Sequence, residues 1–221
     1  MLEAWEFAVR RPELLAGWTL DHLQITFVAV GIAIILGVSV GVYITGKGKE
    51  NIADAVLYLA EIAMTIPSLA LFGLLMVILS WIGLKTIGFL PAIIALIIYA
   101  QLPILRNTYT AIQAVDPAMI EAGRGMGMSE KQLLFKVKLP LAVPVIMAGL
   151  RNAIVLTIAI AAIASLIGSG GLGVPIFRGL RNARMDLIIV GGVSVAILGL
   201  LADALMSRVE RWVTPKGLKA G

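Results

Sequence analysis

Cysteine is absent from this chain of 221 residues, and histidine occurs once, as His22. The sequence therefore provides no disulfide, no thiol nucleophile and no metal site built from several cysteine or histidine ligands. Charged residues are also scarce, at 14% of the chain, whereas a typical soluble domain has about 25%. A catalytic Ser/His/Asp set is not credible with one histidine, and the low charge points away from a water-soluble enzyme.

The N-terminal residues 1–18 lack the features of a secretory signal peptide. They have no basic start followed by an apolar core, and they carry Glu3, Glu6 and Glu13. Trp18 is a bulky apolar side chain in this polar segment. Two interpretations stay open, a short amphipathic helix at the membrane surface and a mobile tail.

Apolar residues are abundant, at 60% of the chain, against about 45–50% in soluble domains. A helix needs about 20 largely apolar residues to cross a bilayer. Five segments satisfy this requirement: 23–45, 62–82, 87–105, 143–167 and 187–206. We therefore predict an all-α, polytopic membrane protein with about five transmembrane helices, in which residues 1–221 form one domain. Prolines within the spans predict kinks, and they are Pro67, Pro91, Pro103 and Pro144.

Basic residues indicate the orientation of the spans, because they accumulate in cytoplasmic loops. The segments 46–61, 106–142 and 207–221 contain eleven Lys and Arg residues, and the segments on the other side contain six. We therefore expect the N-terminus outside the cell and the C-terminus in the cytoplasm. The net charge of +5 is then explained by the loops, without nucleic acid as a partner.

Two charged residues stand inside the predicted spans, Arg151 in the fourth and Asp203 near the end of the fifth. Charges in a membrane pair with one another, line a functional pathway, or extend to the interface when they lie near a helix end. These interpretations stay open for both residues. Gly37 and Gly41 form a pair of small residues that allows close contact between helices.

The segment 107–140 is charged and lies between very apolar stretches. Asp116 can cap a helix that begins at Pro117. Gly125 and Gly127 are expected to end this helix, because glycine tolerates the left-handed backbone that follows a helix C-terminus. The segment therefore begins with a helix of about two turns.

A second helix is predicted to begin at Ser129. Gln132 lies three positions later, which fits a capping box, and Pro140 is expected to stop the helix. Two short helices are not stable alone, so we expect them to dock on another protein or on the spans. A DNA-reading helix-turn-helix has similar ingredients, but the tether between two spans argues against it.

The sequence Glu121-Ala122-Gly123, followed by Gly127 and Leu139-Pro140, resembles the EAA loop of permeases in binding-protein-dependent ABC importers. Gly123 replaces an alanine of that pattern, which we expect to loosen the first helix by up to about 1 kcal/mol. In that family the loop is a coupling helix that fits a cleft on the ATPase subunit. The resemblance therefore implies that these six residues couple the spans to an ATPase.

Three further stretches, 66–70, 102–109 and 167–173, resemble the osmoprotectant branch of that family, which imports glycine betaine, carnitine, choline and related quaternary amines. The resemblance covers about residues 20–205 and implies a transmembrane fold like that of methionine importers. It also implies the inner membrane of a prokaryote and three partners: a separate ATPase, an extracellular or periplasmic binding protein, and a second permease copy, identical or similar.

No cofactor is expected on this chain, and ATP and Mg are expected on the partner ATPase. The segment 168–173 fits G-x-G-x-x-G, but it follows a span and lies outside any βαβ unit, so it predicts a tight turn. No phosphate-binding G-x-x-x-x-G-K-[ST] sequence occurs. We expect His22, beside Asp21, to cap or anchor the first helix at the membrane interface.

Polar residues within the spans are candidates for lining a substrate pathway, and they are Thr65, Ser68, Tyr99, Gln101 and Thr157. A secondary transporter would show inverted repeats and ionisable groups at the bilayer midplane, and the sequence shows neither. A non-transporting scaffold would explain a docking loop, but it would not explain spans that contain prolines and polar residues. An ABC permease with methionine or another small solute as cargo remains the alternative.

Overall fold

The computed structural model describes residues 2–214, and that part of the chain contains helices and no strands, which confirms the predicted all-α class. The elements in chain order are α1 (Leu2–Arg10), α2 (Pro12–Ile44), α3 (Glu50–Thr65), α4 (Ser68–Trp81), α5 (Phe89–Gln113), α6 (Pro117–Gly125), α7 (Glu130–Leu133), the π-helical turn η1 (Leu134–Lys138), α8 (Leu139–Ala164), the 3-10 turn η2 (Ser165–Ile167), α9 (Gly173–Arg181) and α10 (Met185–Val213).

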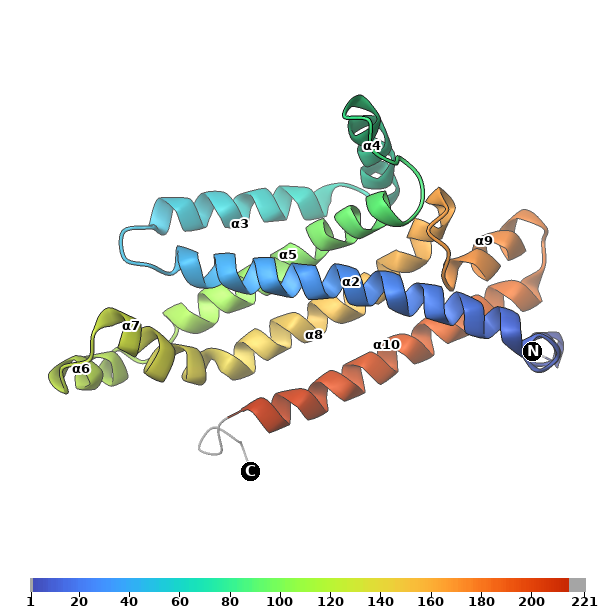
Figure 1. Cartoon of the computed structure of the whole chain (residues 1–221). Coiled ribbons are helices and arrows are strands. Elements are labelled where there is room, and N and C mark those ends of the chain that lie inside the picture. Colours follow the sequence, from blue (N-terminus) through green and yellow to red (C-terminus); the bar gives the residue numbers. More distant parts are fainter. Residues whose placement is uncertain (1, 215–221) are drawn as a thin grey trace.

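Four helical stretches in the described residues are long and apolar enough to cross a membrane: α2, α5, the continuous stretch Glu130–Ile167 and α10. The pair α3 and α4 forms a fifth candidate, bent by 104° at its break. Figure 1 shows α2, α5, α8 and α10 side by side, with α4 projecting from the bundle. The described residues thus contain four candidate spans, or the predicted five if the bent pair is counted as one span.

The predicted span 62–82 is not one helix. The structure begins α3 at Glu50, well before the predicted start, and separates it from α4 at Ile66 and Pro67. Proline disfavours the helical backbone in the preceding residue, and Ile66 is extended, with φ −68° and ψ 125°. The beginning of α3 contains several acidic residues, and the sequence therefore predicts a loop there instead of a helix.

The prediction that Pro140 stops the second loop helix is wrong. The helix runs from Glu130 through η1 into α8, so the loop and the fourth span form one stretch of 38 residues. In the π-helical turn the backbone hydrogen bonds span five residues instead of four, as in the bond from the N–H of Leu139 to the carbonyl of Leu134. Such turns help a helix to accommodate proline, which lacks an N–H.

Helix α5 is the centre of the bundle and packs against α2, α8, α3 and α4. The predicted close contact at Gly37 and Gly41 is confirmed within the chain. A Cβ atom on Gly37 would lie 2.6 Å from Ile104, and one on Gly41 would lie 2.7 Å from Thr108, both on α5. Side chains larger than hydrogen would force α2 away from α5.

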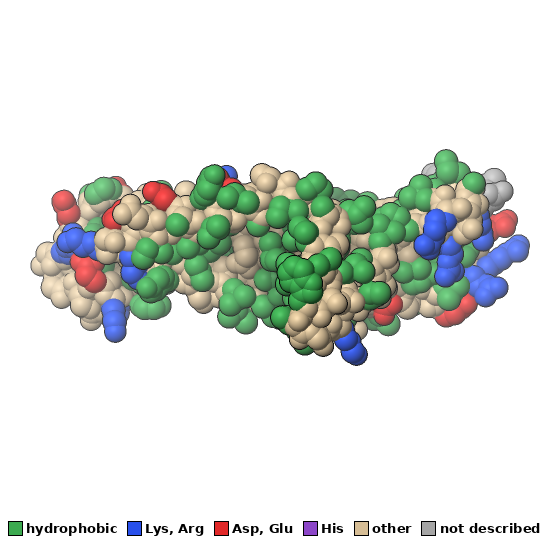
Figure 2. Space-filling model, turned by 90° about the horizontal axis from the view of Figure 1, so that it is seen from above, with side chains coloured by type: hydrophobic (Ala, Val, Ile, Leu, Met, Phe, Trp, Pro, Cys, Tyr) green, Lys and Arg blue, Asp and Glu red, His purple; other side chains and the backbone are tan. Residues whose placement is uncertain are grey.

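The surface divides into charged ends and an apolar middle. Figure 2 shows Lys, Arg, Asp and Glu side chains gathered mainly at the two ends of the molecule, with hydrophobic side chains between them. Large apolar side chains such as Phe27 and Trp81 are each 82% exposed. This distribution suits a protein whose middle is surrounded by lipid.

The N-terminal segment is helical in the structure, as α1, and packs against α10. The rings of Phe7 and Trp18 stack with their centroids 6.2 Å apart. Of the two interpretations of this segment, the helix is therefore supported and the mobile tail is not.

Candidate coupling hairpin and membrane pathway

The helices α6 and α7 form an exposed hairpin at one end of the bundle (Figure 1). Asp116 caps α6 as predicted, because its Oδ1 atom accepts a hydrogen bond of 2.8 Å from the backbone N–H of Ala118. Pro117 occupies the first turn, where its missing N–H leaves no hydrogen bond unmade. The start of the hairpin is therefore determined by two adjacent residues.

The turn and the start of the second helix also follow the prediction. Gly127 has a φ of +77°, in the left-handed region that favours glycine. Ser129 and Gln132 form the complete capping box, in which the backbone N–H of Ser129 donates to Oε1 of Gln132 at 2.9 Å. The two loop helices are thus joined by a turn whose backbone hydrogen bonds are satisfied locally.

Gly123 has a packing role that the sequence pattern did not reveal. A Cβ atom there would lie 2.5 Å from Cδ2 of Leu133, and Leu133 is fully buried. Glycine therefore lets α6 and α7 lie in close contact. Arg124 and Glu130 form an ion pair across the hairpin at 2.9 Å. The hairpin has a small core of its own and one cross-link at its surface.

The six predicted coupling residues occupy two places. Glu121, Ala122 and Gly127 are exposed on the hairpin and Gly123 is buried within it, whereas Leu139 and Pro140 are half-buried at its base. Large apolar side chains are also exposed on and next to the hairpin: Met119, Met126 and Phe135. The hairpin therefore presents apolar side chains together with the carboxylate of Glu121, a surface suited to a protein partner.

Two of the predicted pathway residues flank the break between α3 and α4. Thr65 is the last residue of α3 and Ser68 is the first of α4. Tyr99 is buried behind the break, where its hydroxyl donates to the backbone carbonyl of Ile66. The structure thus brings Thr65, Ser68 and Tyr99 together from α3, α4 and α5.

The other two predicted pathway residues lie inside the bundle. Gln101 donates from Nε2 to the carbonyl of Ala33 on α2, at 3.4 Å. Thr157 is fully buried and donates to the carbonyl of Ala153 at 2.7 Å. The structure does not place either residue with the group at the break.

An ion pair that the sequence pattern does not reveal lies next to the break. Glu61 on α3 accepts from the guanidinium of Arg106 on α5. The sequence predicts both residues in cytoplasmic loops, because they lie just outside the predicted spans. Helical spacing could have placed Glu61 near Thr65, four residues later, but no local signal connects Glu61 with Arg106.

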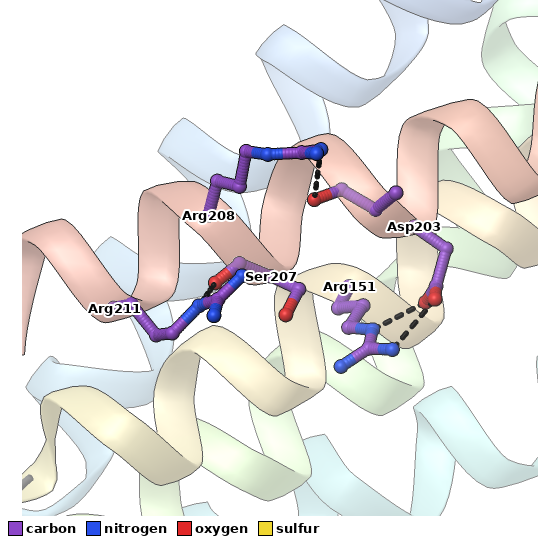
Figure 3. A network of polar contacts seen from close by, with 6 residues as sticks. Arg151, Asp203, Ser207, Arg208 and Arg211 are labelled. Atoms are coloured by element: carbon purple, nitrogen blue, oxygen red, sulfur yellow. Dashed lines mark hydrogen bonds and ion pairs between the residues drawn. The ribbon is translucent and has the colours of Figure 1, made fainter.

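Arg151 and Asp203 form an ion pair between α8 and α10 (Figure 3). The guanidinium donates to both carboxylate oxygens, and the Nη2 to Oδ2 distance is 2.6 Å. The side chains are 37% and 34% exposed. Of the interpretations left open by the sequence, the structure shows pairing, which links two helices.

His22 does not cap or anchor a helix end at the interface, because α2 begins ten residues earlier, at Pro12. Its side chain is fully buried. Nδ1 accepts a hydrogen bond of 3.2 Å from the backbone N–H of Leu172, and Nε2 lies 3.0 Å from the carbonyl oxygen of Ile158. His22 therefore connects α2 with α8 and with the 168–173 turn.

Two open grooves lie at opposite ends of the bundle. One, of about 830 Å³, lies between α1 and the connection of α9 to α10, and its lining includes Arg10, Arg11 and Asp186. The other, of about 620 Å³, lies beside the hairpin and is rich in lysine. Within residues 2–214, no group of three His, Asp or Glu side chains is arranged to hold a metal ion.

Apolar spans, one broken span and an exposed helical hairpin together define a multi-pass membrane transport protein. Residues 33–215 match the family described as the inner membrane component of binding-protein-dependent transport systems. The chain belongs to this family, which makes it a transport permease.

The most informative relatives in sequence are permeases of known systems. The chain is 43% identical over 205 residues to the osmoprotectant import permease protein OsmW of Salmonella typhimurium, covering 93% of this chain and 94% of that protein. It is 43% identical over 199 residues to the glycine betaine/carnitine/choline transport system permease protein OpuCB of Bacillus subtilis, covering 90% and 88%.

Solved structures show the same fold. A chain of the MetNI methionine ABC transporter in inward-facing conformations superimposes with a TM-score of 0.81 at 25% identity, covering 93% of this chain and 99% of that one. A chain of an amino acid ABC transporter gives a TM-score of 0.77 at 24% identity, covering 92% and 95%. The predicted methionine-importer-like fold is confirmed.

Proposed function

We propose that this chain is the membrane-spanning permease subunit of an ATP-driven importer of small osmoprotectants such as glycine betaine, carnitine or choline. The observation that carries the proposal is the 43% identity, over nearly the whole chain, to a permease named for osmoprotectant import. Methionine is the alternative cargo, supported by the MetNI likeness, but that chain is only 25% identical.

Three partners follow from this proposal. A separate ATPase, which carries ATP and Mg, receives the α6–α7 hairpin in the cytoplasm. A substrate-binding protein delivers cargo at the opposite end, near the charged groove beside α1. A second permease copy, identical or similar, completes the pathway. The N-terminus then lies outside the cell and the C-terminus in the cytoplasm.

The geometry supports a direct mechanical link between ATPase and pathway. Leu133 anchors α6 on the second hairpin helix, and that helix continues without a break into the fourth span. Movement of the ATPase would therefore displace residues 117–138 and the span together. Alternate closing of the outer and inner ends of the bundle would move cargo across the membrane.

Substitution Glu121→Lys tests this docking. Glu121 is exposed, so reversing its charge leaves the fold of the chain intact. Loss of a central interface contact costs about 2 kcal/mol or more, a loss of affinity of about 30-fold. We expect co-purification of the ATPase and uptake of labelled betaine to fall together, with unchanged helical content.

Asp54→Lys is the matched control, because Asp54 is exposed on α3, outside the hairpin. The control should retain both ATPase capture and uptake. Normal uptake in Glu121→Lys would refute the docking role of the hairpin.

A further inference from the structure

Arg106, which pairs with Glu61, lies on the side of α5 that faces away from α2. Ile104 and Thr108 face α2, where they contact Gly37 and Gly41. Arg106 lies two positions from Ile104, which turns it by about 200° around the helix. Arg106 is accordingly exposed, on the side of the bundle opposite α2.

This ion pair lies next to the break between α3 and α4. Glu61 precedes Ile66, where the break begins, by five residues, which is about 7 Å along the helix at a rise of about 1.5 Å per residue. The side chains of Arg106 and Glu61 are 51% and 43% exposed, although the two charges are paired with each other. Exposed charges beside a broken span face water or another protein rather than lipid.

The break beside the pair supports the same conclusion. A helix interrupted within the membrane leaves backbone groups without helical partners, and such backbone occurs only where it is covered by protein or lines water. The break has Thr65 and Ser68 on its two sides, and Thr65 is exposed one helical turn after Glu61. Tyr99 donates a hydrogen bond to the carbonyl of Ile66 at the break. It lies two helical turns before Arg106, on the same face of α5.

We propose that Glu61 and Arg106 form a transit site for zwitterionic cargo, in which the quaternary ammonium group faces Glu61 and the cargo carboxylate faces Arg106. This inference rests on the proposed function and adds to it the residues that select the cargo.

The two charges are complementary to such a cargo. A quaternary ammonium group has no N–H, so it interacts with Glu61 through charge alone. A carboxylate can form two parallel hydrogen bonds with the guanidinium of Arg106. The site has no net charge before or after a zwitterion enters, since each residue exchanges its protein partner for a cargo group. Choline has no carboxylate and would leave Arg106 unpaired, so among the proposed cargoes this site favours glycine betaine and carnitine.

The absence of cysteine allows a direct test in the assembled transporter. Thr65→Cys introduces the only thiol of this chain, one turn from Glu61. Two thiosulfonate reagents of similar size are compared, one carrying a trimethylammonium group and one a sulfonate group. Intact-mass measurement of this chain gives the rate of each reaction, and betaine is then added as a competitor.

The proposal predicts the direction in which each variant changes the labelling rates. Thr65→Cys reacts with both reagents, and betaine slows the reaction. Adding Glu61→Gln lowers the ratio of the cationic to the anionic rate by about fivefold, and adding Arg106→Gln raises it by a similar factor, the change that about 1 kcal/mol produces. The double variant Glu61→Gln/Arg106→Gln leaves no unpaired charge. It should keep the rate ratio of Thr65→Cys but lose protection by betaine, so it tests the site if either single variant fails to fold.

Thr157→Cys is the control, since Thr157 is fully buried and should react with neither reagent. The proposal is overturned if Thr65→Cys is inert, or if the rate ratio is the same in all backgrounds. A charge-dependent ratio without protection by betaine would overturn the zwitterion as cargo. Labelling requires no ATP turnover, so failure of the ATPase-docking proposal would not affect this result.

Discussion

At the scale of single residues, His22 shows how one side chain can join three segments. The partners of its ring are the carbonyl of Ile158 and the N–H of Leu172, which are 136 and 150 positions away in the sequence. A buried N–H without an acceptor is costly. His22 therefore stabilises the 168–173 turn by accepting the hydrogen bond of Leu172.

We predict that His22→Phe lowers stability by about 1–3 kcal/mol, the cost of a buried donor left without a partner. His22→Asn should recover part of this loss, because its side-chain carbonyl oxygen can accept from the N–H of Leu172 in place of Nδ1. Thermal unfolding of the purified protein in detergent provides the measurement. Equal losses in both variants would contradict the role of this hydrogen bond.

Residues also differ in how well the sequence predicts them. Asp116 and Ser129 were assigned as helix caps, and the structure confirms both, because a cap bonds with groups two or three positions away. His22 was misplaced because its partners are distant in sequence. The same reason hid the pairing of Glu61 with Arg106.

At the scale of elements, two prolines have opposite effects. Pro67 separates α3 from α4, whereas Pro140 lies within a continuous helix. The π-helical turn η1 directly precedes Leu139 and Pro140, whereas the residue before Pro67 has an extended backbone. Sequence alone does not distinguish these outcomes, because both prolines carry the same constraint and their surroundings decide how the backbone accommodates it.

The hairpin allows a double-mutant test of its packing. Gly123→Ala should weaken the contact of α6 with α7, since the added Cβ would lie 2.5 Å from Leu133, and such overpacking typically costs about 1–3 kcal/mol. Leu133→Val removes one carbon and should restore part of the loss when combined with Gly123→Ala. Hydrogen exchange of the amides of residues 117–133 measures the effect.

Two energies of opposite sign compete in this experiment. Alanine is the better helix former, by about 1 kcal/mol relative to glycine. Slower exchange in Gly123→Ala alone would mean that helix propensity dominates and that the close contact carries no constraint. Additive effects of Gly123→Ala and Leu133→Val would likewise argue against direct contact.

At the scale of the whole molecule, hydropathy was sufficient to locate the regions that can span a membrane. It did not reveal the 104° bend between α3 and α4, because the average hydropathy of a segment carries no information on the direction of the helix axis. Acidic residues in the first turns of α3 also made a helix resemble a loop. The missed half-span therefore includes Glu61, which belongs to the proposed transit site.

The predicted orientation can be measured with single cysteines, since the natural sequence contains none. Met126 is exposed in the hairpin turn and Asn182 is exposed after α9, at the other end of the bundle. A membrane-impermeant maleimide should label Asn182→Cys in intact cells, and Met126→Cys only after permeabilisation. The reverse pattern would place the hairpin outside the cell and remove it from reach of an ATPase.

The uninterrupted helix from Glu130 to Ile167 fixes the rotational phase between the two ends of the molecule. Each added residue would turn everything beyond it by about 100°, so one insertion after Pro140 would carry Arg151 away from Asp203 and Ile158 away from His22. Length changes in this helix are therefore tolerated only near whole turns.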